Sequence, residues 1–248
     1  MALSSPALSL GSSRSKGAPL PASWGQPPAL RTRSAAPGGA AGLPAHPARP
    51  LAASRATCAA LGGGGRASAG STALFLIRHG EAEHNVARAR GGVQEYWSWE
   101  WKDSRLTPAG REQAAAIAPA LEGVVFDAVI VSPLSRAMET AALALPQSCQ
   151  RLVAWEGVRE TYGAHPCNMR MSAEEISLEF PQVDISLLHD EKGPRCDPFW
   201  SEERENDGAL VARARAVARE IRAAYPAARQ IAIFSHHDFL VALSSEVG

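Results

Sequence analysis

The chain has 248 residues with 25 basic and 25 acidic side chains, but its formal net charge of zero averages two unlike segments. Residues 1–70 hold seven lysines and arginines and no acidic residue, whereas residues 71–248 hold 18 basic and all 25 acidic residues. The acidic second segment argues against non-specific nucleic-acid binding, and no apolar run reaches the ~18 residues of a spanning helix. Four scattered cysteines without CxxC spacing indicate ordinary reduced thiols rather than a zinc site or a disulfide framework.

The first 70 residues have the composition of an organelle transit peptide. They are rich in Ala, Ser, Gly, Pro and Arg, and their apolar residues follow no period, so they bury too little surface to offset the entropy of ordering. We expect residues 1–70 to be disordered and to direct the protein to a plastid, with mitochondrion and cytoplasm as alternatives. The alternative interpretation is a disordered tail without a targeting role. Residues 71–248 have the size of one domain.

Four short apolar runs in this domain predict strands. They are residues 73–77, 127–131, 152–154 and 231–234. Helix signals lie between them and predict helices at 109–121, 136–145, 173–180 and 205–225. Alternating strands and helices indicate an α/β fold with three α/β/α layers and a mostly parallel central sheet.

The helix boundaries are marked by capping residues. Thr107 precedes Pro108 as an N-cap, Ser135 is the predicted cap of the second helix, and Ser172 forms a capping box with Glu175. The last long helix carries a stripe of apolar residues at spacings of four, three and four, and Pro226 ends it.

Charged and polar residues follow each predicted strand. In parallel sheets ligands bind beyond the carboxyl ends of the strands, so Arg78, His79, Arg136, Glu160 and His236 are expected at one rim. Arginine forks match the oxygens of a phosphate group. A histidine in line with phosphorus can attack it and form a phosphohistidine, and a carboxylic acid can protonate the leaving oxygen. The set favours phosphoryl chemistry without a metal or cofactor.

The motifs also resemble those of a known family. Leu76–Glu81 reads LIRHGE, Leu106–Gly110 reads LTPAG, and Ser132–Thr140 reads SPLSRAMET, followed by Ser235-His236. This ordered series is similar to that of the histidine phosphatase superfamily, the phosphoglycerate mutase-like proteins. The stretch Arg159–Asn168 resembles a plant and fungal phosphoglycerate mutase-like subgroup.

The resemblance implies a role for each matching residue. His79 corresponds to the phosphorylated nucleophile, and Glu160 corresponds to the acid, for which Glu156 and Glu81 are competitors. The expected phosphate-binding side chains are Arg78, Arg136, Asn85 and His236.

Several residues have two interpretations. The strand register favours His236 over His237 as the second phosphate-binding histidine, although the family more often has a small residue after it. Asn85 is also a candidate cap for a helix beginning near Val86. His84 and His165 are interpreted as polar loop residues near the rim.

An aromatic segment precedes the second motif. Trp97, Trp99 and Trp101 alternate, so an extended chain would point all three to one side, where they would form a lid, a partner surface or part of the domain's own packing.

The favoured function is a phosphatase that hydrolyses a small phosphomonoester through a phosphohistidine, with neither nucleic acid nor membrane as a partner and the oligomeric state left open. The first alternative is a phosphomutase, which returns the phosphoryl group to another hydroxyl. The second alternative is a non-catalytic module that binds phosphorylated ligands.

Overall fold

A computed structural model describes residues 57–61, 72–145, 152–192 and 196–247. The chain divides into two units, Met1–Arg49 and Pro50–Gly248, and every described residue belongs to the second unit. The expected transit peptide therefore lies outside the described residues, apart from residues 57–61. Among the described helices, none is long and apolar enough to cross a membrane.

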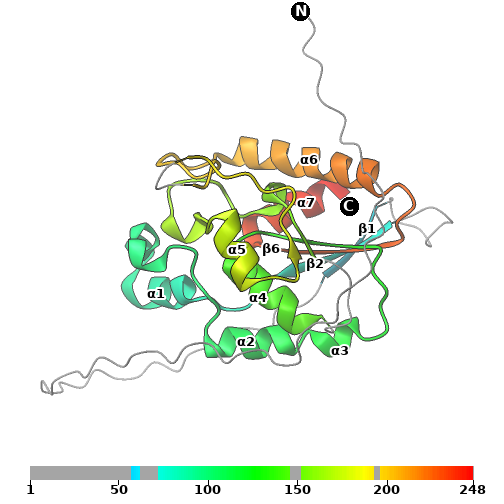
Figure 1. Ribbon diagram of the computed structural model, residues 1–248, viewed down its shortest axis with the longest axis horizontal. Coiled ribbons are helices and arrows are strands. Elements are labelled where there is room, and N and C mark those ends of the chain that lie inside the picture. Colours follow the sequence, from blue (N-terminus) through cyan, green and yellow to red (C-terminus); the bar gives the residue numbers. More distant parts are fainter. Residues whose placement is uncertain (1–56, 62–71, 146–151, 193–195, 248) are drawn as a thin grey trace, which may run out of the picture. The chain divides into compact units, whose positions relative to one another are not determined.

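The described part of the chain forms one six-stranded sheet with helices on both faces (Figure 1). The strands are β1 (Thr57–Leu61), β2 (Thr72–Arg78), β3 (Ala128–Val131), β4 (Leu152–Ala154), β5 (Val183–Asp184) and β6 (Gln230–Ser235). The helices are α1 (Glu83–Gly91), α2 (Pro108–Ala115), α3 (Ala118–Leu121), α4 (Ser135–Ala144), α5 (Ala173–Glu179), α6 (Asp207–Ala224) and α7 (His237–Val247). Short 3-10 turns are η1 (Val93–Trp97), η2 (Trp99–Trp101), η3 (Glu156–Val158) and η4 (Pro166–Asn168).

The sheet has the order β1-β2-β6-β3-β4-β5, and all its pairings are parallel except that of β1 with β2. The prediction of a mostly parallel three-layer α/β fold is thus confirmed. β6, the last strand in the sequence, lies between β2 and β3, so the ends of β2 and β6 are neighbours and Arg78 pairs with Ser235. This register brings residues from opposite ends of the domain to one rim.

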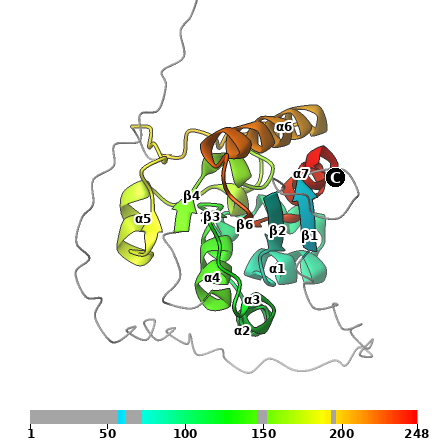
Figure 2. The ribbon, with the colours of Figure 1, turned by 90° about the vertical axis from the view of Figure 1, so that its right-hand side faces the viewer.

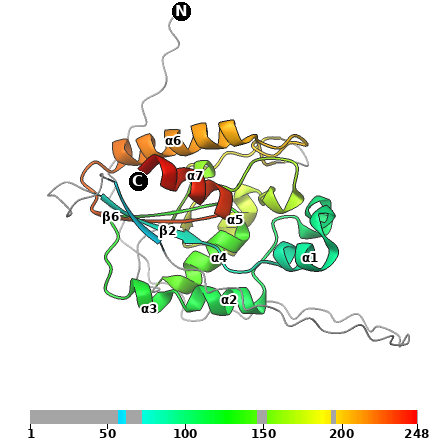
Figure 3. The same ribbon diagram turned by 180° about the vertical axis from the view of Figure 1, so that it is seen from behind.

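Side chains alternate between two apolar cores because successive residues of a strand point to opposite faces. Val129 and Val131 of β3 belong to the core that includes α3, α4 and α5, whereas Ala128 and Ile130 belong to the core that includes α6 and α7. Figure 2 shows α6 and α7 on one side of the strands and α2, α3 and α4 on the other. The same layers are visible from behind in Figure 3.

The predicted boundaries hold at several places and fail at three. The N-cap at Thr107 and the capping box of Ser172 and Glu175 are both present. The helix predicted at 109–121 is broken after Ala115, because Pro119 lacks the N–H that would bond the Ala115 carbonyl and its ring clashes with that carbonyl. Ser135 is the first helical residue of α4 rather than its cap.

The third difference concerns the edge of the sheet. All of residues 1–70 are expected to lie outside the domain, yet Thr57–Leu61 forms β1 and pairs antiparallel along β2, from Thr57 opposite Leu76 to Leu61 opposite Thr72. The segment TCAAL has no alternating pattern to mark it as a strand. Its pairing instead satisfies the backbone of the β2 edge, a long-range effect that composition does not reveal.

Candidate active site

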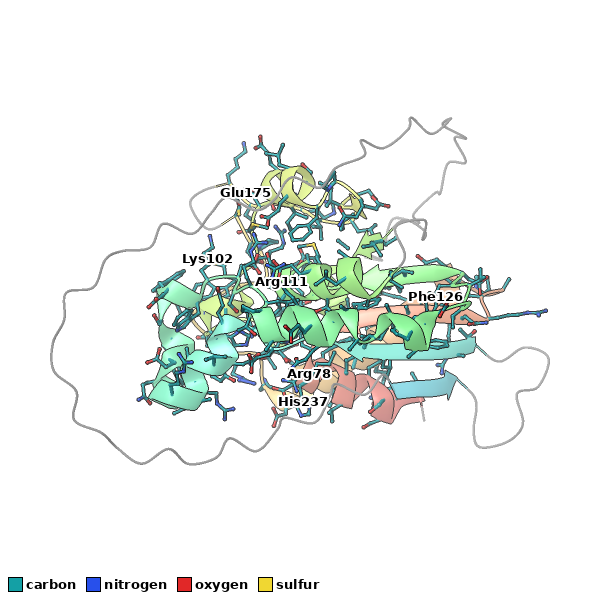
Figure 4. The ribbon with its side chains drawn as sticks, turned by 90° about the horizontal axis from the view of Figure 1, so that it is seen from below. Arg78, Lys102, Arg111, Phe126, Glu175 and His237 are labelled. Atoms are coloured by element: carbon teal, nitrogen blue, oxygen red, sulfur yellow. The ribbon has the colours of Figure 1, made fainter. Side chains whose placement is uncertain are left out.

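A cavity of about 280 Å³ lies beyond the carboxyl ends of β2 and β6. Its walls come from β2, α1, η1, α4, the segment from residue 160 to 168, and the start of α7. Its lining residues are Arg78, His79, His84, Asn85, Arg88, Tyr96, Arg136, Glu160, Thr161, His165, Cys167, Asn168, Arg204, His237 and Asp238. Arg78 and His237 are labelled in Figure 4, near the ends of their strand and helix. Five of the six predicted site residues therefore line one cavity.

His79 follows β2 directly and is nearly buried, with its backbone N–H bonded to the Ser235 carbonyl at 3.0 Å. Its Nδ1 lies 2.6 Å from the Gly80 carbonyl, and its Nε2 lies 3.2 Å from Nε of Arg136. A carbonyl only accepts and a guanidinium only donates, so Nδ1 carries the proton and Nε2 presents its lone pair. Burial, assisted by Arg136, lowers the pKa of His79 well below its usual value, which keeps the ring neutral.

Arg136 occupies the first turn of α4 and is almost completely buried. Besides His79, it donates from Nη1 to the Cys167 carbonyl at 2.6 Å and from Nη2 to Oδ1 of Asn168 at 2.9 Å. All three acceptors are neutral, and burial lowers the pKa of the guanidinium. A buried cation held only by neutral acceptors beside a helix N-terminus favours an anionic ligand.

The start of α4 is held by a distant carboxylate. Asp103 accepts hydrogen bonds from the backbone N–H of Ser135 at 2.9 Å and from its hydroxyl at 2.7 Å. It also accepts from the Met171 N–H at 3.3 Å. Asp103 thus ties the first residue of α4 to the segment that follows η4.

His236 and His237 occupy different places. The His236 ring is completely buried and its centre lies 5.0 Å from that of His79. Its Nε2 lies 2.8 Å from the Ser132 hydroxyl, while its Nδ1 has no hydrogen-bond partner in the described part of the chain. Burial lowers the pKa of His236 well below its usual value. His237 is exposed and lines the cavity.

Asn85 contributes to the cap of α1 from the third helical position, because the helix begins at Glu83 rather than near Val86 as expected, and its contact with phosphate stays a prediction. Its Oδ1 accepts from the Ala82 N–H at 3.0 Å at the start of α1, and its Nδ2 lies 3.1 Å from Nε2 of His84. The Nδ1 of His84 lies 2.5 Å from the Ser104 hydroxyl. Asn85 therefore caps α1 and still faces the cavity, which leaves one amide hydrogen for a ligand.

The surroundings of the three carboxylates distinguish which of them can act as the acid. Glu156 accepts from Arg159 and Arg170 in a buried ion-pair cluster, and Glu81 accepts from the Thr107 hydroxyl. Of the three, only Glu160 lines the cavity. Burial, followed by the nearby charge of Asp238, raises the pKa of Glu160.

Arg78 differs from Arg136 in its exposure. It is an exposed side chain at the end of β2, and it lines the cavity. No carboxylate within the described ranges lies at ion-pair distance from either Arg78 or Arg136, so both charges face the cavity without a counter-ion.

Several wall residues were not predicted as site residues. His84 and His165, interpreted as loop residues, line the cavity together with Tyr96. The rings of Tyr96 and His165 lie 4.9 Å apart. Cys167 is also on the wall, and burial raises the pKa of its thiol to about 11, so it is neutral. Both histidines were expected near the rim and both line the cavity, but His84 belongs to the first turn of α1 rather than to a loop.

The aromatic segment is not extended. η1 and η2 turn the chain, so the three tryptophans do not share one side. The Trp97 ring meets His165 edge-on at 4.9 Å, and Trp99 lies 5.3 Å from Trp200. Trp101 donates from Nε1 to Glu95.

Comparison with known proteins places this site in a family. The sequence profile of the histidine phosphatase superfamily (branch 1) matches residues 74–247. Phosphoglycerate mutase-like protein 1 of Arabidopsis thaliana is 26% identical over 67% of this chain and 68% of its own length. A broad-specificity phosphatase of Saccharomyces cerevisiae is 39% identical over 36% of this chain and 37% of its own length.

The similarity extends to a solved structure. The ecdysone phosphate phosphatase of Bombix mori, determined in complex with tungstate, has a TM-score of 0.53 at 16% identity over 70% of this chain and 76% of that chain, which shows a shared fold. The chain spans about half the length of a relative from Arthroderma benhamiae, with 33% identity over 56% of this chain and 48% of that protein. The chain belongs to the histidine phosphatase superfamily, among its plant and fungal phosphoglycerate mutase-like members.

Proposed function

We propose that the protein is a phosphatase that hydrolyses a small phosphomonoester through a phosphohistidine at His79. The observation that carries this proposal is the tautomer of His79, whose Nδ1–H is held by the Gly80 carbonyl while Nε2 presents its lone pair beside Arg136. A cavity of about 280 Å³ is near the lower limit of ligand pockets, which suits a small substrate.

In the first step, the hydrogen bond from Nε of Arg136 to Nε2 of His79 breaks, Nε2 attacks phosphorus, and an N–P bond forms as the ester P–O bond breaks. The leaving oxygen takes a proton from the carboxyl group of Glu160, whose raised pKa favours the protonated form. The products of this step are an alcohol, a phosphohistidine and a Glu160 carboxylate.

In the second step, water attacks the phosphohistidine. Glu160 accepts a proton from the water as the new P–O bond forms, and the N–P bond breaks to return the lone pair to Nε2. Arg78 and Arg136 balance the charge of the phosphoryl oxygens, with hydrogen bonds from Asn85 and His236. Because Arg136 and Asn85 are held by hydrogen bonds before the substrate binds, they stabilise the transition state with little reorganisation. We propose that the reaction needs no metal ion.

The test replaces the nucleophile. His79→Ala is expected to lose the hydrolysis of p-nitrophenyl phosphate by several orders of magnitude, and acid-labile labelling by a ³²P-phosphomonoester should disappear with it. The control is His189→Ala, which changes an exposed histidine outside the cavity. Wild-type turnover by His79→Ala would refute the proposal, and loss of wild-type activity in EDTA would refute metal independence.

A phosphomutase differs from a phosphatase in the acceptor of the phosphoryl group. Transfer from phosphohistidine to a second hydroxyl would convert 3-phosphoglycerate to 2-phosphoglycerate. We expect release of inorganic phosphate to exceed this conversion. Conversion faster than phosphate release would assign the protein to the mutases, and a protein that binds phosphate but does neither would be a non-catalytic module.

We also propose that the acid-free segment 1–70 directs the enzyme to a plastid. The support is its composition, which contains seven basic and no acidic residues. Fusion of residues 1–70 to a fluorescent protein should give plastid fluorescence in plant cells. A cytoplasmic or mitochondrial signal would contradict this assignment.

A further inference from the structure

The guanidinium of Arg136 is oriented by a side chain that sequence analysis did not identify. Asn168, in the turn η4, presents Oδ1 to Nη2 of Arg136 at 2.9 Å, while the Cys167 carbonyl accepts from Nη1 at 2.6 Å. Together with the bond from Nε to His79, these contacts fix the guanidinium plane. Each terminal nitrogen keeps one hydrogen for a ligand.

The Asn168 amide has only one possible orientation. Its Nδ2 donates to the Thr161 carbonyl at 2.9 Å, and that carbonyl only accepts, whereas Arg136 only donates. Asn168 is nearly buried, so neither bond is exchanged easily with water. One amide thus connects the segment that carries Glu160 and Thr161 to the arginine beside His79.

The backbone of Asn168 is held in place by a buried ion-pair cluster. Its backbone carbonyl accepts from Nη2 of Arg159 at 2.5 Å. Arg159 is held by two hydrogen bonds to Asp197, at 2.8 and 2.6 Å, and by one to Glu156 at 2.9 Å. The side chains of Arg159, Asp197 and Glu156 are all nearly buried, so this ion-pair cluster is more rigid than a surface loop.

We propose that Asn168 is a positioning residue of the phosphoryl site, holding the Arg136 guanidinium in the plane that receives the phosphoryl oxygens. It acts through the acceptor Oδ1, and its neutral amide leaves the charge of Arg136 available to the ligand. This inference rests on the proposed phosphate chemistry of the cavity.

The test distinguishes the two hydrogen bonds that the Asn168 side chain makes. Asn168→Ala removes both and is expected to lower kcat on p-nitrophenyl phosphate by roughly tenfold to a hundredfold, because a small displacement of a catalytic group has such effects. Asn168→Asp restores an acceptor for Arg136 but not the donor to Thr161. It should recover kcat to within about fivefold of wild type, with a raised KM because the new carboxylate competes with the substrate for Arg136.

The matched control is Asn206→Ala, which removes the side-chain cap that Asn206 provides to the Ala209 N–H at the start of α6. It should lower the melting temperature without changing kcat. If Asn168→Asp is as inactive as Asn168→Ala, the bond to Thr161 is the one that matters and the inference is wrong. Equal kcat for Asn168→Ala and wild type would also overturn it.

Orthophosphate binding, measured by calorimetry, separates this inference from the proposed function. Wild type should bind orthophosphate and Asn168→Ala should bind it at least about tenfold more weakly. Equal binding by the two proteins would overturn the positioning role while leaving the phosphatase proposal intact. Failure of wild type to bind orthophosphate would overturn both.

Discussion

Gly80 and Gly110 pack backbone to backbone, so closely that neither position has room for a side chain. A Cβ on Gly80 would lie 2.3 Å from the Gly110 carbonyl oxygen, and a Cβ on Gly110 would lie 1.9 Å from the Glu81 carbonyl oxygen. The first turn of α2 therefore presses directly on the loop after His79. The glycine in the LTPAG motif is explained by this contact rather than by helix formation, which glycine disfavours.

Gly110→Ala is accordingly expected to lower the free energy of unfolding by about 2 kcal/mol or more, because a backbone carbonyl must move to admit the methyl group. It should also lower kcat, since the displaced loop carries His79. Urea unfolding and steady-state kinetics measure the two effects. The control is Gly208→Ala in the first turn of α6, where the nearest atom is the Asn206 side-chain oxygen at 3.3 Å and a change below ~1 kcal/mol is expected. Equal stability of the two variants would contradict the packing argument.

The pH dependence of catalysis should report Glu160. Burial and then Asp238 raise its pKa, so the proton needed by the leaving group is retained to higher pH than in an exposed glutamate. kcat/KM should fall as pH rises through this pKa. Asp238→Asn removes the neighbouring negative charge, lowers the Glu160 pKa, and should move this alkaline limb to lower pH. An unmoved limb would assign it to another group.

The leaving group provides a second test of Glu160. Glu160→Gln cannot donate a proton, so it should lose about 10²-fold or more on an alkyl phosphate such as glycerol phosphate. The loss on p-nitrophenyl phosphate should be much smaller, because nitrophenolate leaves without protonation. The two substrates control for each other in one variant. Equal losses on both would remove Glu160 from the role of general acid.

Three of the four buried histidines in the described part of the chain have strongly lowered pKa values and should make the fold sensitive to acid. Burial is the largest cause that lowers the pKa values of His79, His84 and His236 well below 6.5. In the unfolded chain these residues take up protons as pH falls through ~6.5, while in the folded chain they stay neutral, so protonation favours unfolding. This contribution to stability is complete above that pH and is lost progressively below it.

The expected slope is up to about 4 kcal/mol per pH unit for the three histidines together. Urea unfolding between pH 7 and pH 5 measures it. His84→Gln removes one of the three and should reduce the slope by about 1.4 kcal/mol per pH unit, whatever its effect on stability at pH 7. A slope unaffected by His84→Gln would contradict the assignment.

Much of the fold was predictable because its signals are local. Apolar runs located β2, β3, β4 and β6, and parallel strands bring their carboxyl ends to one edge, so residues such as His79 and His236 were expected to meet. Two strands escaped prediction for a physical reason. β5 has only two residues, and β1 owes its structure to its partner strand rather than to its own pattern.

The residues that hold the site residues in place were less predictable than the site residues themselves. Asn168 depends on Arg159, which in turn depends on Asp197, 38 residues further along the chain. No period or motif connects such positions, because a buried ion pair is specified by the packed fold and not by local sequence. The same applies to Asp103, which accepts from the first residue of α4 across 32 positions of the chain.

The β1 pairing predicts where the N-terminal segment can be removed. A protein lacking residues 1–56 keeps β1, whereas one lacking residues 1–70 exposes the backbone edge of β2 along the register from Leu76 to Thr72. Both truncations should keep the kcat of the full chain, because the described cavity draws no residue from this segment. The longer truncation should unfold at a lower temperature and self-associate through the open edge, which thermal melts and light scattering would detect. Identical melting and scattering of the two proteins would show that β1 does not stabilise the sheet. In that case a targeting segment could be cleaved before or after β1 without loss of stability.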